Sequence, residues 1–418
     1  MAESDSTLLR LCEHQTTGVT WTADTREAVA NAATSWAQAH QLSHPPLTFE
    51  GSGGCTLRTQ QFVGVVEAGG VRVEIYPKLD ASLVKDQIVD ENRARTVMAN
   101  LLWLLEESGY DGLVDAGDAS VEESPDTISD LLAWLFARRL RDQLSIGMPH
   151  DYLSMHDDLP FKRGRIQFTR QATQLFGRPD MLACEWDEFS PDTPLARLLR
   201  CATEALLARV RLPGAAADLR DALAMLDDAQ SVHPLEALST STQIRWSRLN
   251  ARWRRCHDLA QAVLRGLGRE LHAGGTESFV FLIDMNALFE SYCARWIEEC
   301  FRVPVRTQVF LGRLLLREQR SLHQYADFLW RDRTQGLWVG DAKYKISTRD
   351  DWPKIDDVRQ MICYGQLAAI REGSVPGSLM LLYPSTTDER AEQVSTFDQQ
   401  ALTLQPVRVT RPQVAGSA

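Results

Sequence analysis

The sequence lacks several features that would assign a function at once. It has no nucleotide-binding motif and no apolar run that approaches the length of a membrane span. Its first ten residues are polar and lack the apolar core of a secretion signal. We therefore expect a non-secreted, cytoplasmic protein that does not associate with membranes and binds no nucleotide itself.

The eight cysteines are too scattered to form a metal site or a disulfide framework. The sequence contains no C-x-x-C pair and no clustered set of cysteine and histidine. Isolated cysteines of this kind behave as small, buried hydrophobic residues in a reducing compartment. Zinc ligands and disulfides are therefore not expected.

Positive charge is scarce in the first third of the chain. Residues 1–130 hold 8 Lys and Arg against 21 Asp and Glu, whereas the whole chain has a net charge of −11. Residues 302–345 carry nine basic and four acidic groups. Because the local balance decides what a surface binds, the N-terminal part is a poor surface for DNA and suits a protein partner.

The length of 418 residues predicts more than one domain. We expect an acidic N-terminal α+β domain at 1–150, a mainly helical middle region at 151–275, and a C-terminal domain at 276–418. Gly274-Gly275 is the best candidate for the second boundary. In the N-terminal domain, Gly69-Gly70 separates two β-patterned runs and predicts a hairpin with a type I′ turn. Helical patterns on either side make this a mixed hairpin and helical region.

The C-terminal pattern predicts the element order α, β, β, β, α, β. The stretch 281–301 is expected to form a helix and 305–316 a strand. After a hairpin, 352–371 is expected to form a second helix and 378–383 a short buried strand. The fold class is therefore α/β in the broad sense, and α+β overall.

The hairpin at residues 323–345 carries the residues most suggestive of chemistry. Two aromatic and apolar runs flank a polar turn that ends at Gly336. Because side chains alternate along a strand, Asp341 and Lys343 project from one side, with Asp327 on the neighbouring strand. Two carboxylates can hold Mg²⁺, and a lysine can offset charge on a phosphate.

The triplet alone is a weak signal, because Asp-x-Lys is common by chance and a charged hairpin is usually a solvated surface. Two other features support it. Glu290, near the middle of the preceding helix, can add a ligand or hold a metal-bound water, whereas Asp284 is expected to cap that helix. Gln360 and Tyr364 share one face of the following helix and can bind a phosphate, a lysine or a water.

Two other regions are candidates for DNA contact. The basic loop LPFKRGRIQF contains Arg163 and Arg165, which either meet phosphates or form a solvated turn. A long helix is predicted over 244–267. Its arginines, among them Arg248 and Arg252, form a stripe that lies either along a duplex or in solvent. Lys345, beside the acidic hairpin, is a further expected contact.

Together these motifs resemble the PD-(D/E)xK nuclease superfamily, in the version with a helix glutamate and a QxxxY motif. More narrowly, the chain is similar to the McrC family, the nuclease subunits of McrBC restriction systems. FLIDMNALFE, HQYADF, VGDAKYK and DDVRQMICYG match its nuclease motifs, and EIYPKL, LPFKRGRI and CEWDEFSPDTPLARLLRCA match its upstream pattern. The resemblance therefore covers most of the chain. Ala326 stands where the superfamily name has proline, which is not a ligand, so the difference affects shape at most.

The resemblance implies a DNA endonuclease that depends on Mg²⁺, with Mn²⁺ as an alternative, in a restriction-endonuclease-like C-terminal domain. Asp327, Asp341 and Glu290 would hold the metal. Lys343 would position or activate water and stabilise the charge that develops on the phosphate. Gln360 and Tyr364 would orient the substrate or the lysine.

The resemblance also implies a partner, an McrB-like AAA+ GTPase that reads modified cytosine in DNA and whose GTP hydrolysis this chain would stimulate through its N-terminal part. Two alternatives stay open. A stand-alone nuclease would cut DNA with Mg²⁺ and without nucleotide. For a non-catalytic DNA-binding or regulatory protein on the same fold, metal binding would not be weakened by Asp327→Asn.

Overall fold

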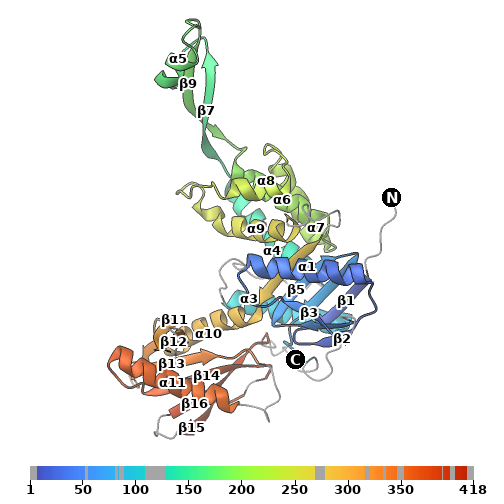
Figure 1. Ribbon diagram of the computed structural model, residues 1–418, viewed down its shortest axis with the longest axis vertical. Coiled ribbons are helices and arrows are strands. Elements are labelled where there is room, and N and C mark those ends of the chain that lie inside the picture. Colours follow the sequence, from blue (N-terminus) through green and yellow to red (C-terminus); the bar gives the residue numbers. More distant parts are fainter. Residues whose placement is uncertain are drawn as a thin grey trace, which may run out of the picture. The chain divides into compact units, whose positions relative to one another are not determined.

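A computed structural model gives the fold of the chain (Figure 1). It describes residues 7–51, 55–80, 83, 89–108, 128–268, 278–315, 321–332, 336–345, 353–387, 389–395 and 401–411. The chain packs as two compact units, one made of Met1–Leu131 with Glu270–Ala418 and the other of Leu132–Arg269. The division at 150 and 275 stays a prediction, and Gly274-Gly275 lies outside the described residues. None of the described helices is long and apolar enough to cross a membrane.

A four-stranded sheet in the first unit joins segments from both halves of the sequence, in the order β1-β6-β5-β10. Its strands are β1 Thr7–Cys12, β5 Phe62–Ala68, β6 Val71–Tyr76 and β10 Phe279–Asp284. β1 runs parallel to β6, and the other two pairings are antiparallel. Gly69 and Gly70 turn between β5 and β6 with φ of +58° and +76°, which confirms the predicted hairpin.

β10 corrects the prediction that one helix covers 281–301. This apolar run begins as a strand paired with β5, and the helix α10 spans only Met285–Phe301. A short apolar run fits a buried strand as well as a buried helix, so periodicity could not decide between them. Asp284 is the helix cap, as predicted, and its carboxylate accepts a hydrogen bond from the backbone N–H of Asn286. A further helix of this unit, α3 (Glu91–Ser108), packs against α10.

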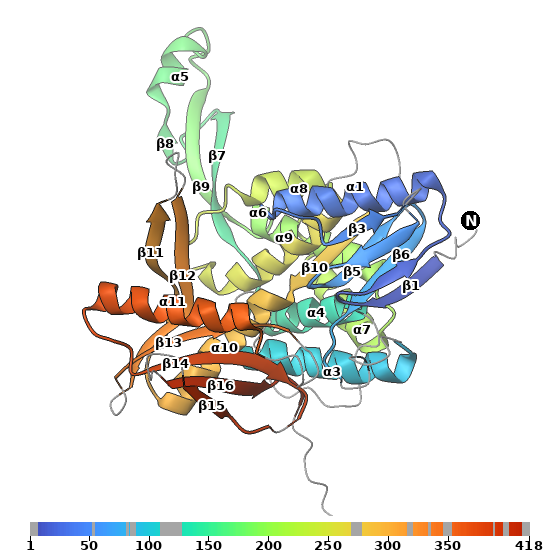
Figure 2. The same ribbon diagram turned by 60° about the horizontal axis from the view of Figure 1, so that its bottom comes forward.

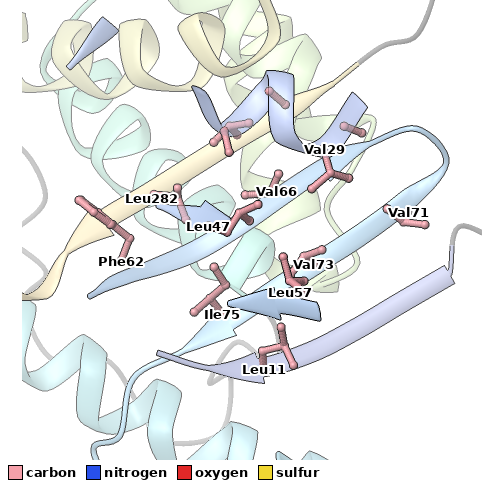
Figure 3. Packing of buried hydrophobic residues seen from close by; sticks show 14 of the residues in the cluster. Leu11, Val29, Leu47, Leu57, Phe62, Val66, Val71, Val73, Ile75 and Leu282 are labelled. Atoms are coloured by element: carbon pink, nitrogen blue, oxygen red, sulfur yellow. The ribbon is translucent and has the colours of Figure 1, made fainter. Parts of the chain in front are cut away.

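Aliphatic side chains fill the space between this sheet and helix α1 (Ala23–Ala39). Val29 of α1, Val66 of β5 and Leu282 of β10 belong to one buried cluster (Figure 3). A small sheet of order β2-β4-β3 contributes Leu47 to the same cluster. Its strands are β2 Thr16–Gly18, β3 Leu47–Glu50 and β4 Thr56–Thr59. A strand from the C-terminal half is thus part of the core of the N-terminal half.

A six-stranded mixed sheet, of order β11-β12-β13-β14-β16-β15, forms the other core of the first unit. Its strands are β11 Arg306–Leu315, β12 Ser321–Asp332, β13 Gly336–Ala342, β14 Ser378–Ser385, β15 Glu392–Ser395 and β16 Ala401–Arg408. β14 runs parallel to β13 and β16, and the other pairings are antiparallel. The order α10, β11, β12, β13, α11, β14 along the chain is the predicted one, and β12 and β13 form the predicted hairpin.

Helices cover both faces of this sheet. On one face, α11 (Ile355–Glu372) crosses the strands (Figure 2), and its Met361 packs in one buried cluster with Val339 of β13. On the other face, the Phe301 ring of α10 lies 5.3 Å from the Trp338 ring, centroid to centroid. Successive residues of β13 therefore face different helices, which fixes the side to which Asp341 points.

The second unit combines helices with a β-arm, which we define as residues 151–190. The helices are most of α4 Ile128–Ile146, then α6 Pro194–Leu207, α7 Pro213–Met225, α8 Pro234–Ser241 and α9 Arg254–Gly268. The arm extends away from α6 and α8 (Figure 1). It contains β7 Asp151–Leu159, β8 Arg165–Ile166, the short helix α5 Phe168–Thr173 and β9 Leu182–Ser190, with the sheet order β7-β9-β8.

The prediction of a helix over 244–267 is wrong for residues 244–253, because α9 begins only at Arg254. The side-chain oxygen of Asn250 accepts a hydrogen bond from the backbone N–H of Ser247, and its side-chain amide donates one to the carbonyl of Arg245. Such local bonds compete with those of a helix. Arg248 and Arg252 therefore precede α9 and do not lie on one helical stripe.

Candidate active site

The predicted carboxylates come together where two strands separate. The ladder between β12 and β13 ends at the pair Phe328 and Gly340, and the next residue on each strand is an aspartate, Asp327 or Asp341. The backbone N–H of Ala342 donates to Oδ2 of Asp327 at 2.8 Å. Asp341 is only 2% exposed. The hairpin thus places one buried carboxylate and one partly buried carboxylate side by side.

These two carboxyl groups hold their protons more tightly than free aspartates do. Burial, followed by the charge of Asp327, raises the pKa of Asp341 to about 7. Burial, followed by the charge of Glu290, raises the pKa of Asp327 to about 6. Because the two groups interact, they titrate as a pair. Ionisation of both carboxyl groups is therefore unfavourable at this poorly solvated position, and a bound cation would favour it.

Lys343 supplies a positive charge to this pair. Its Nζ lies 2.6 Å from Oδ2 of Asp341, and its side chain is 20% exposed. Burial by itself lowers the pKa of Lys343, but the attraction of Asp341 and Asp327 outweighs burial and raises the pKa above its ordinary value. The ammonium therefore stays charged at neutral pH, so this lysine acts through charge and N–H donors and is a poor general base.

Gln308, which the sequence interpretation missed, connects Glu290 to the pair. Its Nε2 donates to Oε2 of Glu290 at 2.9 Å and to Oδ1 of Asp327 at 3.3 Å. Its backbone has a φ of +48°, which is costly for a residue with a side chain. Burial raises the pKa of Glu290, and the hydrogen bond from Gln308 lowers it by a smaller amount, so the pKa is raised overall. No sequence motif marks Gln308, because its role depends on a contact between β11, β12 and α10.

Gln360 and Tyr364 occupy the predicted face of α11. Nε2 of Gln360 donates to the Tyr364 hydroxyl at 2.5 Å. Tyr364 is buried in the cluster between α11 and the sheet, and burial raises the pKa of its hydroxyl. The charges of Asp341 and Lys343 also influence the pKa of this hydroxyl, so Tyr364 lies near the carboxylate pair, and Gln360 lies beside Tyr364. Their bond to each other fixes the orientation of the amide.

The expected DNA-contacting cations mostly have partners within the protein. Lys345 Nζ lies 2.9 Å from each carboxylate oxygen of Asp357. In the arm, Arg163 stacks on the Trp186 ring and pairs with Glu188, and Arg165 pairs with Glu185. Arg252 donates to the backbone carbonyls of Gln143 and Gly147, at 2.7 Å each. Arg248 is exposed. Contact of these residues with DNA stays a prediction.

The donor set fits a divalent cation in part. In the described part of the chain, no three or more His, Cys, Asp or Glu side chains are grouped closely enough to hold a metal ion. The pair of Asp327 and Asp341 remains as the candidate set of metal ligands. Mg²⁺ is commonly held by one or two carboxylates together with several waters, so two oxygen-bearing groups suffice. Glu290 reaches the pair through Gln308, and its direct ligation of a metal stays a prediction.

Because the Asp327 and Asp341 carboxylates are poorly solvated and repel each other, we predict that Asp341→Asn stabilises the metal-free protein at pH 8. The folded-state pKa of Asp341, about 7, exceeds the ordinary value of 3.8. Its stabilising contribution is therefore complete below pH 3.8 and is lost as the pH rises through 7. Asparagine cannot ionise, so the melting temperature at pH 8 with chelator should rise by a few degrees, with little change near pH 4. Asp356→Asn, at an exposed carboxylate, is the control. A lower melting temperature for Asp341→Asn at pH 8 would contradict the prediction.

Fold and site together define a mixed α/β protein in which a buried aspartate, a partly buried aspartate and a lysine lie together at one sheet. The model of the McrBC 5-methylcytosine restriction system component family matches residues 57–384, so this chain belongs to that family.

The fold is similar to that of a chain in a half-complex from the tetradecameric assembly of Thermococcus gammatolerans McrB AAA+ hexamers with bound McrC. That match has a TM-score of 0.67 and 17% identity, and covers 96% of this chain and 95% of the other. A chain of the Thermococcus gammatolerans McrBC complex matches with a TM-score of 0.49 and 17% identity, over 70% of this chain and 87% of the other. Among curated proteins, no match to the sequence was found.

Proposed function

We propose that this chain is the Mg²⁺-dependent DNA endonuclease subunit of a modification-dependent restriction system. The observation that carries the proposal is the Asp327 and Asp341 pair with the Lys343 ammonium 2.6 Å from one of its oxygens. The pair lies at the end of a β-ladder in a mixed sheet whose elements follow the order α-β-β-β-α-β. This arrangement supports a restriction-endonuclease-like core, and family membership supports a role in restriction.

The site suits hydrolysis of a phosphodiester. Asp327 and Asp341 would hold Mg²⁺, or Mn²⁺, with Glu290 as a further or water-mediated ligand. A metal bound there polarises the phosphate and lowers the pKa of a water. Lys343, fixed on Asp341, offers N–H donors to the phosphate oxygens on which negative charge grows. The raised pKa of Lys343 favours this electrostatic role over proton abstraction from water.

The helix α11 has a supporting role in this proposal. The hydrogen bond between Gln360 and Tyr364 holds an amide beside a phenol on which the charges of the carboxylate pair act. Both groups can donate or accept hydrogen bonds. They would therefore orient the substrate phosphate or the ammonium of Lys343 without taking part in proton transfer.

We further propose an AAA+ GTPase of the McrB type as the partner, whose GTP hydrolysis the chain stimulates. The fold resembles that of a chain from an assembly described as McrB AAA+ hexamers with bound McrC. The absence of a nucleotide-binding motif agrees with a GTPase on another chain. Recognition of modified cytosine would belong to that partner, and cleavage of the DNA, in the cytoplasm, to this chain.

The test combines metal binding with cleavage. The wild-type protein should bind Mg²⁺ or Mn²⁺ in calorimetry and cut methylated DNA when the GTPase partner and GTP are present. Asp327→Asn should weaken metal binding more than about 10-fold and abolish cutting, because a neutral amide is a poor ligand for a hard cation. Asp356→Asn, on the exposed start of α11, is the matched control and should behave as wild type.

The same experiment separates the alternatives. Cutting by the purified chain without partner or nucleotide would favour a stand-alone nuclease. Absence of cutting, together with metal binding that Asp327→Asn leaves intact, would favour a non-catalytic DNA-binding protein. Either result overturns part of the proposal, the first the partner and the second the reaction.

A further inference from the structure

The segment just after β13, which carries Lys343, is tied by a buried hydrogen bond to the four-stranded sheet of β1, β6, β5 and β10, called the N-terminal sheet below. The hydroxyl of Tyr344, the next residue, donates to Oε1 of Glu13 at 2.7 Å. Tyr344 is 7% exposed and Glu13 is 1% exposed. The two residues are separated by 331 positions in the sequence. The bond thus connects the end of β1 to the end of β13, and both ends belong to the first unit.

Glu13 is itself held in place by the N-terminal sheet. Its backbone N–H donates to the Tyr76 carbonyl at 3.0 Å, and the backbone N–H of Lys78 donates to its Oε1 at 2.8 Å. These contacts come from the last residue of β6, the parallel neighbour of β1, and from Lys78 just after it. The carboxylate is therefore a fixed acceptor, aimed at Tyr344 by two strands.

Core packing does not account for a carboxylate at this position. Burying a carboxylate costs several kcal/mol unless hydrogen bonds compensate, whereas an aliphatic side chain would be stabilising. Among the described residues, Oε2 of Glu13 is buried without a hydrogen-bond partner. Burial raises the pKa of Glu13 to about 7, although the hydrogen bonds from Lys78 and Tyr344 act to lower it. The residue thus costs folding free energy, and Tyr344 is the side chain that donates a hydrogen bond to it.

The geometry of β13 and of the two residues after it indicates what this contact does. Alternate side chains face opposite sides, so Asp341 and Lys343 point one way and Tyr344 points the other, toward Phe289 of α10. The backbone N–H of Lys343 donates to the Leu382 carbonyl of β14, which fixes one edge of the chain. At the next residue, the bond from Tyr344 to Glu13 holds the chain on the side opposite to Lys343.

We propose that Glu13 is a positioning residue for Lys343, acting through the Tyr344 hydroxyl. The proposal rests on the nuclease function proposed above. In this arrangement the N-terminal sheet sets the place of the catalytic ammonium, so the four-stranded and the six-stranded sheets of the first unit contribute to one functional site. A displacement of about 1 Å in such a group can lower turnover about 100-fold.

The test uses three substitutions with different hydrogen-bonding capacity. Tyr344→Phe removes the donor and keeps the ring, Glu13→Leu removes the acceptor, and Glu13→Gln keeps the acceptor oxygen without the charge. Tyr344→Phe and Glu13→Leu should each lower kcat about 10- to 100-fold and leave KM for DNA nearly unchanged. Glu13→Gln should stay close to wild type. The double variant Glu13→Leu, Tyr344→Phe should be no slower than the slower single variant, because both act on one contact.

A second measurement does not depend on cleavage. The sequence has only six lysines, so ¹³C-labelled lysine side chains give few NMR signals, and that of Lys343 is the one missing in Lys343→Ala. It should shift in Tyr344→Phe and Glu13→Leu and stay in place in Glu13→Gln. Tyr292→Phe, at another buried tyrosine, is the control and should leave it in place.

The outcomes are distinguishable. An unchanged Lys343 signal and unchanged kcat in folded Tyr344→Phe would overturn the positioning role while leaving the nuclease proposal standing. If the wild-type chain does not cut methylated DNA with partner and GTP present, the nuclease proposal fails, and the Lys343 signal still decides whether Glu13 positions that side chain. Thermal unfolding of each variant identifies any that fail to fold. In that case Tyr344→Phe, the mildest change, carries the test.

Discussion

Replacement of Lys343 by alanine is expected to lower DNA cleavage by about 10²- to 10⁴-fold, the range for loss of one electrostatic or acid–base group. The ammonium lies 2.6 Å from Asp341 Oδ2, and its side chain is 20% exposed. Charge–charge interactions at such a shielded position are far stronger than in water. Loss of the ammonium should therefore raise the barrier of the chemical step and leave KM for DNA almost unchanged.

Metal binding separates the role of Lys343 from that of the carboxylates. Lys343→Ala removes a cation that competes for Asp341, so the variant should bind Mg²⁺ or Mn²⁺ at least as tightly as wild type. Asp341→Ala should lose both metal binding and cleavage. Lys354→Ala, at an exposed lysine before α11, is the matched control. Cutting at the wild-type rate by Lys343→Ala, with partner, GTP and methylated DNA present, would rule out the assigned role.

Replacement of Gly64 by alanine is expected to destabilise the first unit by about 3 kcal/mol or more, at or above the usual range for overpacking. A Cβ on Gly64 would lie 2.0 Å from the carbonyl oxygen of Phe281 and 2.8 Å from the Cα of Leu282. Both are backbone atoms of β10, which pairs with β5 at this point. The strands would have to separate, because no side-chain rotation relieves the overlap.

The effect of Gly64→Ala should reach the site, because β10 leads through the Asp284 cap directly into the helix that carries Glu290. Denaturant unfolding measures the loss of stability, and cleavage measures its consequence. Gly18→Ala is the control, since no atom lies within 4 Å of its added Cβ, and it should change stability by less than about 0.5 kcal/mol. A Gly64→Ala protein as stable as wild type would mean that the two strands do not approach this closely.

Local patterns in the sequence predicted much of the site and of the sheet around it. The period of two in a strand placed Asp341 and Lys343 on one side, and the spacing of four in a helix joined Gln360 to Tyr364. The cap at Asp284 was likewise a local signal. These predictions succeeded because each depends on residues only a few positions apart.

Contacts between distant segments could not be predicted in this way. Gln308 meets Asp327 and Glu290 only after three elements have packed, and Glu13 meets Tyr344 across most of the chain. The short apolar run of β10 was assigned to a helix because its strand partner lies far away in the sequence. The basic arm residues gave no sign of their pairing with glutamates of β9, since charge patterns do not specify partners.

The membership of β10 in the N-terminal sheet has a consequence for the synthesis of the chain. β5 leaves the ribosome about 210 residues before its partner strand. At roughly 5–20 residues per second, the delay is about 10 to 40 seconds. During this time one edge of β5 has no strand beside it, and an unpaired edge is a template for association with other chains. We therefore expect nascent chains that stall between these strands to depend on chaperones more than the finished protein does.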